Sequence, residues 1–139
     1  MLLSDRLDKE HKHFVQSEQK YRILFNNASD AIFIADAKTG KIIDCNKQAE
    51  KLTGRLRAEM IGLNRSKLHP KNKKRYYDKH FDTHVKMGRI NDLRRAEVIN
   101  NKGEIIPVYI SASVIEIDGK KVIQGIFRDV GINRNKRYT

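Results

Sequence analysis

The chain has 139 residues, a length that suits a single domain with one buried core. Hydrophobic residues make up 39% and charged residues 33%, as in ordinary soluble globular proteins. No apolar run approaches the ~20 residues that cross a bilayer, and the N-terminus becomes charged too early for a secretory signal. We therefore expect a cytoplasmic protein, or a cytoplasmic piece of a longer one.

The formal net charge is +12 at pH 7, which raises the question of nucleic-acid binding. The basic residues are scattered along the chain, and their densest cluster, Lys71 to Lys79, opens a helical stretch. A solvated helix face is the usual explanation for such a cluster, so nucleic acid is not expected as a partner. The single cysteine, Cys45, allows neither an internal disulfide nor a cysteine-based zinc cage, and a small buried residue is its simplest role.

The first third of the sequence predicts a helix followed by a hairpin. Residues 1–28 contain neither Pro nor Gly, and the spacing of their apolar side chains is that of a helix. Two short strands are expected over 31–35 and 41–45, with Thr39-Gly40 as the turn between them.

The middle third predicts a series of helices. Asn46 fits an N-cap, and the helix it opens ends at Gly54, because glycine tolerates the left-handed conformation. A helical turn is expected over 57–61, and the segment just before Pro70 is expected to be irregular, because the residue before a proline disfavours helix. Residues 71–87 predict a longer helix with an apolar stripe at i, i+4 and i+8.

The last third predicts strands over 93–100, 105–117 and 122–130, and Asp118-Gly119 is a strong two-residue hairpin turn. Along 105–117 the even positions are apolar and the odd positions include Tyr and Ser, so one face of that strand is core. These three strands can pair as an antiparallel meander. The helices between the two strand groups must then cross the sheet, which predicts an α+β fold with an apolar pocket between sheet and helices.

Three stretches of the sequence, taken in order and with their spacing, form a recognisable pattern. Its residues are Asp44, Cys45, Asn46, Ala49, Leu52, Thr53, Gly54, Met60, Ile61 and Gly62; then Asn101, Lys102, Gly103, Val108, Tyr109, Ile110, Ser111, Ala112 and Ser113; then Gln124, Gly125, Ile126, Phe127, Arg128, Asp129 and Val130.

Over about 21–131 this pattern resembles the PAS family, as found in bacterial or archaeal histidine kinases and diguanylate cyclases. The resemblance implies a five-stranded, mostly antiparallel sheet with helices packed on one face and an N-terminal flanking helix. It also implies three parts: residues 1–20 as a helical linker or dimerisation segment, 21–131 as the sensor domain, and 132–139 as a tail or a linker to an effector.

Two positions depart from the family pattern. Gly131 replaces the threonine that closes the last motif, and in relatives this end of the strand launches a helix into the effector. Leu56 replaces the Ser or Thr that caps the short helix after Gly54, so we expect a looser turn there.

Haem is the first cofactor to consider, because haem-binding members hold iron with a histidine early in the long helix. Aligning on Leu68-His69-Pro70 puts that position at Tyr77. His80 and His84 lie further along the helix, so ligation would need a shift of register and haem is disfavoured.

Flavin photochemistry in this family needs a cysteine within an Asn-Cys-Arg-Phe-Leu-Gln motif, which is absent here. Non-covalent flavin stays open. His11 and His13 are two apart on a helix and do not face each other, so no metal site is expected. The sequence also lacks a phosphate-binding glycine loop and a nucleophile elbow, so we expect no enzymatic activity in this chain.

The function expected from these observations is signal sensing: a small ligand or cofactor binds in the apolar pocket, and the change reaches a signalling effector, of histidine kinase or diguanylate cyclase type, or a dimer partner. The alternatives are a ligand-free interaction or dimerisation module and a haem-based sensor. The pocket candidates are Ile32, Ile34, Asn46, Leu52, Met60, Leu68, Tyr77, Phe81, His84, Val85, Val108, Ile110, Ala112, Ile123, Gly125 and Phe127. The candidates for a homodimer contact are Phe14, Tyr21, Tyr109 and Ile126.

Overall fold

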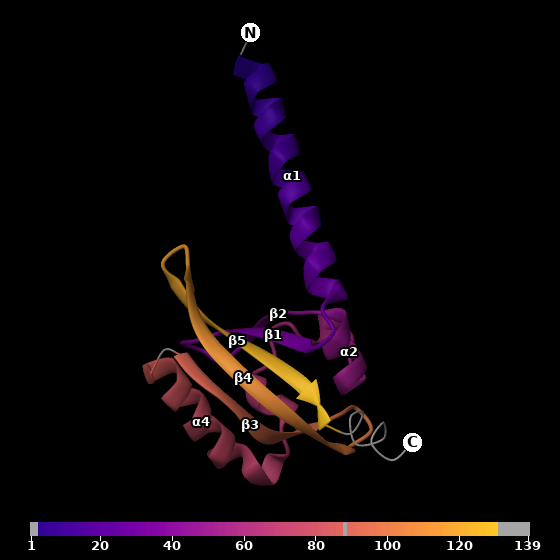
Figure 1. Ribbon diagram of the computed structural model, residues 1–139, viewed down its shortest axis with the longest axis vertical. Coiled ribbons are helices and arrows are strands. Elements are labelled where there is room, and N and C mark those ends of the chain that lie inside the picture. Colours follow the sequence, from indigo (N-terminus) through magenta and orange to yellow (C-terminus); the bar gives the residue numbers. More distant parts are fainter. Residues whose placement is uncertain (1–2, 88, 131–139) are drawn as a thin grey trace.

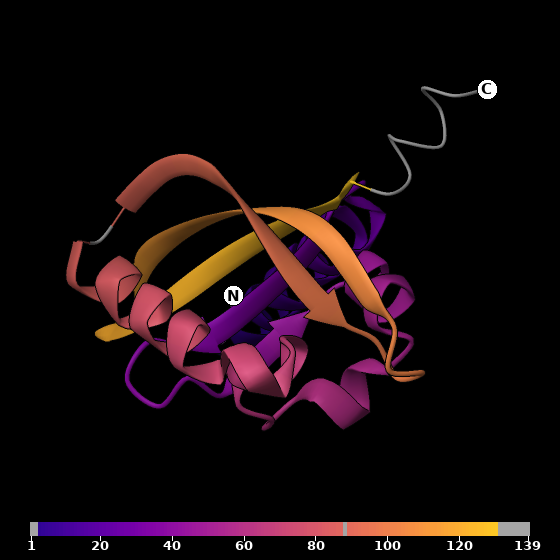
Figure 2. The same ribbon diagram turned by 90° about the horizontal axis from the view of Figure 1, so that it is seen from below.

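The computed structural model describes the backbone of residues 3–87 and 89–130, and the side chains of 6–87 and 94–130. Five antiparallel strands form one sheet in the order β2-β1-β5-β4-β3. The helices α2, α3 and α4 lie along one face of this curved sheet (Figure 2). The elements are α1 (Leu3–Asn27), β1 (Ala31–Asp36), β2 (Ile42–Cys45), α2 (Lys47–Thr53), α3 (Arg57–Met60), the 3-10 turns η1 (Arg65–Leu68) and η2 (Lys71–Lys73), α4 (Lys74–Met87), β3 (Arg89–Ile99), β4 (Ile105–Ile117) and β5 (Lys120–Asp129).

Helix α1 projects away from the rest of the domain (Figure 1). Only its last turns meet the core, where Phe25 is 7% exposed and its ring stacks on Tyr21 with centroids 5.2 Å apart. Earlier along the helix, Phe14 is 65% exposed and Leu7 is 55% exposed. The helix is therefore anchored at one end and leaves much of its apolar surface in solvent.

Strand β1 presents the opposite face from the one expected. Its buried residues are Ala31, Phe33 and Ala35, whereas Ile32 and Ile34 are half-buried on the other side. Every residue from 31 to 35 is apolar, so alternation along the strand carries no signal about its inner face. The register with β5 decides the inner face, because Phe33 lies opposite Gly125 and Ala35 lies opposite Ile123.

Asn46 caps α2 as expected, since its Oδ1 accepts a hydrogen bond from the Ala49 N–H at 3.0 Å. Gly54 ends the helix at φ +69°, and a Cβ there would fall 2.1 Å from Oδ1 of Asn101. Only glycine both adopts this positive φ readily and leaves room for the side chain of Asn101.

The turn after Gly54 is capped although Leu56 has no capping side chain, so the looser turn that we expected is not found. Carboxylate oxygens of Glu50 and Glu59 accept from the backbone N–H groups of Arg57 and Leu56 at 2.8 and 3.0 Å. Neighbouring acidic residues therefore satisfy the helix start that a Ser or Thr cap would otherwise satisfy.

The segment before Pro70 is more regular than expected. Residues Arg65–Leu68 form a 3-10 turn because Oδ1 of Asn64 accepts from the Ser66 N–H at 3.0 Å. A second 3-10 turn covers Lys71–Lys73, so α4 begins at Lys74 rather than at residue 71.

The last three strands form the expected antiparallel meander. Asp118 and Gly119 have φ of +50° and +77°, as a type I′ turn requires. Strand β3 begins at Arg89, earlier than the expected residue 93. Gly131 and the tail 132–139 lie outside the described residues.

Candidate functional site

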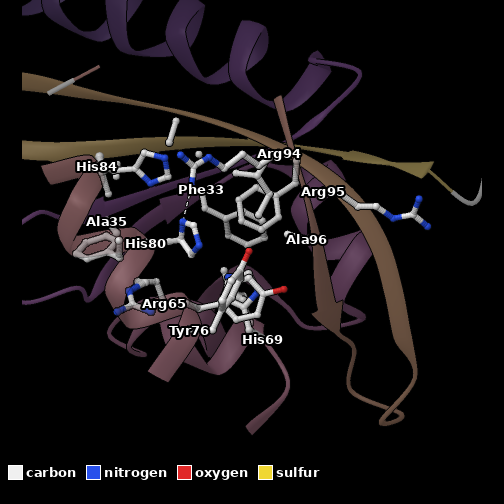
Figure 3. Close-up of a pocket in the computed structure, with 18 residues that line it drawn as sticks. Phe33, Ala35, Arg65, His69, Tyr76, His80, His84, Arg94, Arg95 and Ala96 are labelled. Carbon is white, nitrogen blue, oxygen red and sulfur yellow. Dashed lines mark hydrogen bonds between the residues drawn. The ribbon is translucent and has the colours of Figure 1, made fainter. Parts of the chain in front are cut away.

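A cavity of about 100 Å³ lies between the sheet and α4 (Figure 3). Strands β1, β3, β4 and β5 form one wall, and the opposite wall comes from η1, the segment before Pro70, and α4. The residues that line it are Phe33, Ala35, Arg65, Leu68, His69, Tyr76, Tyr77, His80, Phe81, His84, Arg94, Arg95, Ala96, Ile110, Ala112, Ile123, Gly125 and Phe127.

Aromatic rings form the inner part of the cavity. The rings of Phe33 and Phe127 are 4.8 Å apart at their centroids, and the ring of His69 stacks on Tyr77 at 3.7 Å. Gly125 lies beside them, and a Cβ at this position would meet Cε1 of Phe127 at 2.9 Å. The glycine therefore gives the Phe127 ring the room it occupies.

His69 is a fixed part of this wall. It is 7% exposed, and its Nδ1 lies 2.6 Å from the backbone oxygen of Glu97, so Nδ1 carries the proton and donates. Burial lowers the pKa of His69 to about 4, against the upward effect of this hydrogen bond. The ring is therefore neutral at physiological pH and serves as a packed, hydrogen-bonded plate.

The outer part of the cavity is basic. Arg94, on β3, reaches towards His80 and His84 on α4, and hydrogen-bonds to Nδ1 of His80 (Figure 3). Burial lowers the pKa of both histidines, and the charge of Arg94 lowers them further. Arg65 approaches from η1, with its Cζ 4.4 Å from the ring centroid of Phe81.

Most of the expected pocket residues from α4, β4 and β5 line this cavity. The candidates that line the cavity are Leu68, Tyr77, Phe81, His84, Ile110, Ala112, Ile123, Gly125 and Phe127. Val108 is an exception: it faces the same side of β4 as Ile110 and Ala112 but is fully buried in the core.

The remaining pocket candidates lie elsewhere. Leu52 and Met60 belong to the solid core beneath α2 and α3, and Asn46 is 1% exposed with its amide fully engaged in structural hydrogen bonds. Val85 is half-buried on α4 without lining the cavity. Ile32 and Ile34 face the other side of the sheet, as described above.

Other lining residues were not among the candidates. Phe33 and Ala35 were missed because their strand shows no alternation, and Arg65 and Arg94 are two among 29 basic residues with nothing in the sequence to distinguish them. In the sequence, His69 belongs to the Leu68-His69-Pro70 stretch and shows no sign of a place in the pocket. The other lining residues that the sequence did not indicate are Tyr76, His80, Arg95 and Ala96.

Haem and flavin do not fit this cavity as it stands. Its volume is below that of an engineered cavity of about 150 Å³ that holds one benzene molecule, and both ring systems are much larger than benzene. Cys45, the only thiol, is fully buried away from the cavity lining, and burial raises its pKa to about 11. Either cofactor would require α4 to move away from the sheet.

The four expected dimer-contact residues lie on two surfaces. Phe14 and Tyr21 are 65% and 43% exposed on α1. Tyr109 and Ile126 are half-buried on the sheet face opposite the helices. Within the described residues, no three His, Cys, Asp or Glu side chains come together as a metal site, and no helix is long and apolar enough to cross a membrane.

Comparison with known proteins matches this architecture to one family. The sequence pattern of a family described as "PAS domain" covers residues 29–131. The crystal structure of the PAS domain of an HTR-like protein from Haloarcula marismortui superposes with a TM-score of 0.72 at 18% identity, covering 88% of this chain and 98% of that one. A domain of a sensory box sensor histidine kinase/response regulator from Geobacter sulfurreducens gives a TM-score of 0.67 at 29% identity, covering 81% and 94%.

A curated relative, the methyl sulfide methyltransferase-associated sensor of Methanosarcina acetivorans, is 23% identical over 116 residues. These residues are 83% of this chain but only 11% of that protein, so the chain spans about a tenth of its relative's length. The observed five-stranded sheet with helices on one face is the fold of the matched family, and the match covers most of the sequence. The chain belongs to the PAS domain family and is a sensor domain of the kind found in sensor histidine kinases.

Proposed function

We propose that this domain senses a small ligand in the cavity beneath α4 and passes the change through α1 to a signalling effector or to a dimer partner. The observation that supports this most directly is the cavity itself, an apolar space with a few polar groups at one end. The similarity to a sensory box sensor histidine kinase/response regulator and to a methyltransferase-associated sensor agrees with such a role.

A short path joins the cavity to α1. Phe33, whose side chain lines the cavity, pairs across the sheet with Cys45. The residues on either side of Cys45 hold the end of α1. Asp44 accepts hydrogen bonds from Tyr21 and Arg22, each at 3.3 Å, and the Asn46 amide donates to the backbone oxygen of Phe25 at 3.0 Å.

Asp44 is the charged part of this anchor. Its carboxylate also accepts from Nε of Arg57 at 2.8 Å, so it joins α1, β2 and α3. Burial by itself raises the pKa of Asp44, but the hydrogen bonds from Arg57 and Arg22 outweigh burial and hold the pKa below its usual value. The carboxylate therefore stays charged near neutral pH, and a shift of β1 and β2 would reach α1 through it.

The alternative is a ligand-free dimerisation module, and the exposed apolar side chains of α1 favour it. Phe14, Leu7 and Leu24 are each more than half exposed, and a second copy of the chain would cover them as a paired helix. Sedimentation equilibrium tests the dimer: we expect association of the native chain and a large loss of association in Phe14→Glu. A monomer at high concentration would contradict a homodimer.

The ligand is tested by native mass spectrometry of the gently purified chain. We expect a bound small molecule in the native protein and its loss in Ala112→Leu, which fills the cavity from β4. Ser113→Leu adds the same side chain at the next position, on the opposite face of the strand, and should keep the ligand. If native spectra are repeatedly empty and a ligand screen finds no binder, the dimerisation module is the better account.

A further inference from the structure

The charge of the cavity wall is one-sided. Among the described residues that line it are three arginines and three histidines, and no aspartate or glutamate is among them. Hydrocarbon and aromatic side chains make up most of the remaining wall, including Phe33, Ile110, Ile123 and Phe127. Such a site offers an apolar compartment with positive charge at one end.

Arg65 is held in place but incompletely bonded. Its Nη2 donates to Oδ1 of Asp78 at 2.6 Å, and its guanidinium covers the ring of Phe81. Its Nε and Nη1 are buried and have no hydrogen-bond partner among the described residues. Buried N–H groups without an acceptor are costly, and they mark a place where an acceptor from a ligand would be favourable.

Arg94 supplies a second cation. Its side chain enters the cavity and contacts His80, and no salt bridge joins it to a carboxylate within the part of the chain whose side chains are described. The adjacent Arg95 points away from the cavity (Figure 3). A buried or half-buried arginine ordinarily pairs with an anion, whereas the partner of Arg94 among the described side chains is a histidine.

We propose that the cavity takes a small amphipathic anion, a carboxylic acid with a short acyl chain. The carboxylate accepts hydrogen bonds from the free N–H groups of Arg65 and from Arg94, and its apolar body lies against Phe33 and Phe127. The size limit follows from the cavity volume of about 100 Å³. This inference rests on the proposed function, because it requires the cavity to be a ligand site.

The histidines at the basic end respond to such a ligand. Burial and, after it, the charge of Arg94 lower the pKa of His80 and of His84 and so disfavour their protonated forms. The groups that face them are Arg94 on β3 and, on α4, Lys79 and Tyr76. A carboxylate placed among them would favour protonation, so binding is accompanied by proton uptake and strengthens as pH falls.

The test compares acids with their neutral amides on the full chain. Propionate and butyrate are titrated against propionamide and butyramide by calorimetry and by amide NMR shifts. We expect each acid to bind at least tenfold more tightly than its amide. Arg94→Gln and Arg65→Gln should each weaken the acid at least tenfold and leave the amide unchanged, while Arg75→Gln, an exposed charge on α4, should change neither.

The outcomes test the anionic ligand separately from the ligand-sensing function. If the amides bind as well as the acids, or if a neutral molecule co-purifies in the cavity, the proposal of an anionic ligand is wrong and the ligand-sensing function stands. If no acid or amide binds and native spectra are empty, the sensing function fails with it. An acid that co-purifies with the native chain and is lost from Arg94→Gln supports both. Arg94 is used beside Arg65 because loss of Arg65 also removes one of the two partners of Asp78 and can disturb folding.

Discussion

The helices that cover the sheet form two halves that are packed very differently. Under α2 and α3, Met60, Ala49 and Thr53 are completely buried, and the buried polar groups there are hydrogen-bonded. Under α4, Phe81 and His84 are only half-buried, a cavity remains, and Arg65 keeps two N–H groups without acceptors. The first half has the properties of a structural core, and the second half is less tightly packed and holds the proposed ligand site.

The anchoring of α4 shows the same contrast within a single helix. Near its start, the Tyr77 hydroxyl accepts from the Glu97 N–H at 2.9 Å and Asp78 bonds to Arg65 and Lys74. Further along, the ring of His80 contacts Arg94 and Tyr76, and Phe81 packs on Arg65. The second part of α4 is therefore held by fewer contacts than the first, and we expect it to be the part that moves when the proposed ligand binds.

The largest effect is expected at Asn46, in the packed half. Its Oδ1 accepts from Ile32 and Ala49, and its Nδ2 donates to the backbone oxygens of Phe25 and Asp30. Asn46→Ala removes a helix cap and strands several buried backbone groups, so the free energy of unfolding should fall by at least about 3 kcal/mol in urea denaturation.

Asn72→Ala is the matched control, because Asn72 is exposed at the start of the α4 region and should change stability by less than about 0.5 kcal/mol. A loss below about 1 kcal/mol in Asn46→Ala would mean that the two halves do not differ in the way their packing indicates.

The second effect is a pH dependence that comes from His69. Its folded pKa of about 4 is below the unfolded value, so the unfolded chain binds the extra proton first as pH falls from neutral. Stability is therefore complete above the unfolded pKa and is lost towards pH 4. Between pH 7 and 4.5 the loss amounts to about 2 kcal/mol.

His69→Phe keeps an aromatic ring against Tyr77 and removes the titrating group. Denaturant unfolding of both proteins at the two pH values isolates the contribution, because all other groups titrate in both. Equal pH slopes in the two proteins would show that His69 is not buried in its neutral form.

The sequence predicts the two halves unequally well, for a physical reason. Along β4, Tyr109, Ser111 and Ser113 alternate with Val108, Ile110 and Ala112, so the inner face can be identified without a structure. Capping of α2 and the turn residues are likewise local features. These local signals account for the β1-β2 hairpin, the meander of β3, β4 and β5, and most of the packed half.

The basic end of the cavity has no local signal. Arg65 and Arg94 lie 29 positions apart and meet only because η1 and β3 are brought to the same side of the sheet. The inner face of β1 depends on its register with β5 and not on its own apolar residues. Nonlocal pairing of this kind decides which residues line the cavity and joins β1 to β5, whereas local patterning decides the individual helices and hairpins.

The third effect concerns the link from the packed half to α1. Asp44→Asn keeps the size of the side chain but removes the charge that Arg22 and Arg57 share. We expect a loss of about 1 kcal/mol in global stability and faster amide exchange in the last turns of α1. Asp82→Asn, on an exposed part of α4, is the control. Unchanged exchange at 21–27 in Asp44→Asn would mean that Phe25 and Asn46 alone hold the helix.

The smallest effect is expected in the second part of α4. Val85 is half-buried and does not line the cavity, so Val85→Ala should cost about 0.5 kcal/mol, whereas Met60→Ala in the solid core should cost at least about 2 kcal/mol.

Native-state amide exchange should also show residues 80–87 opening at lower free energy than α2, because few buried contacts hold them. A bound ligand that joins Arg94 to the cavity should slow exchange in 80–87 and leave α2 unchanged. Equal protection of the two helices in the ligand-free chain would contradict a rigid half beside a movable one, and the ligand would then have to act through the sheet.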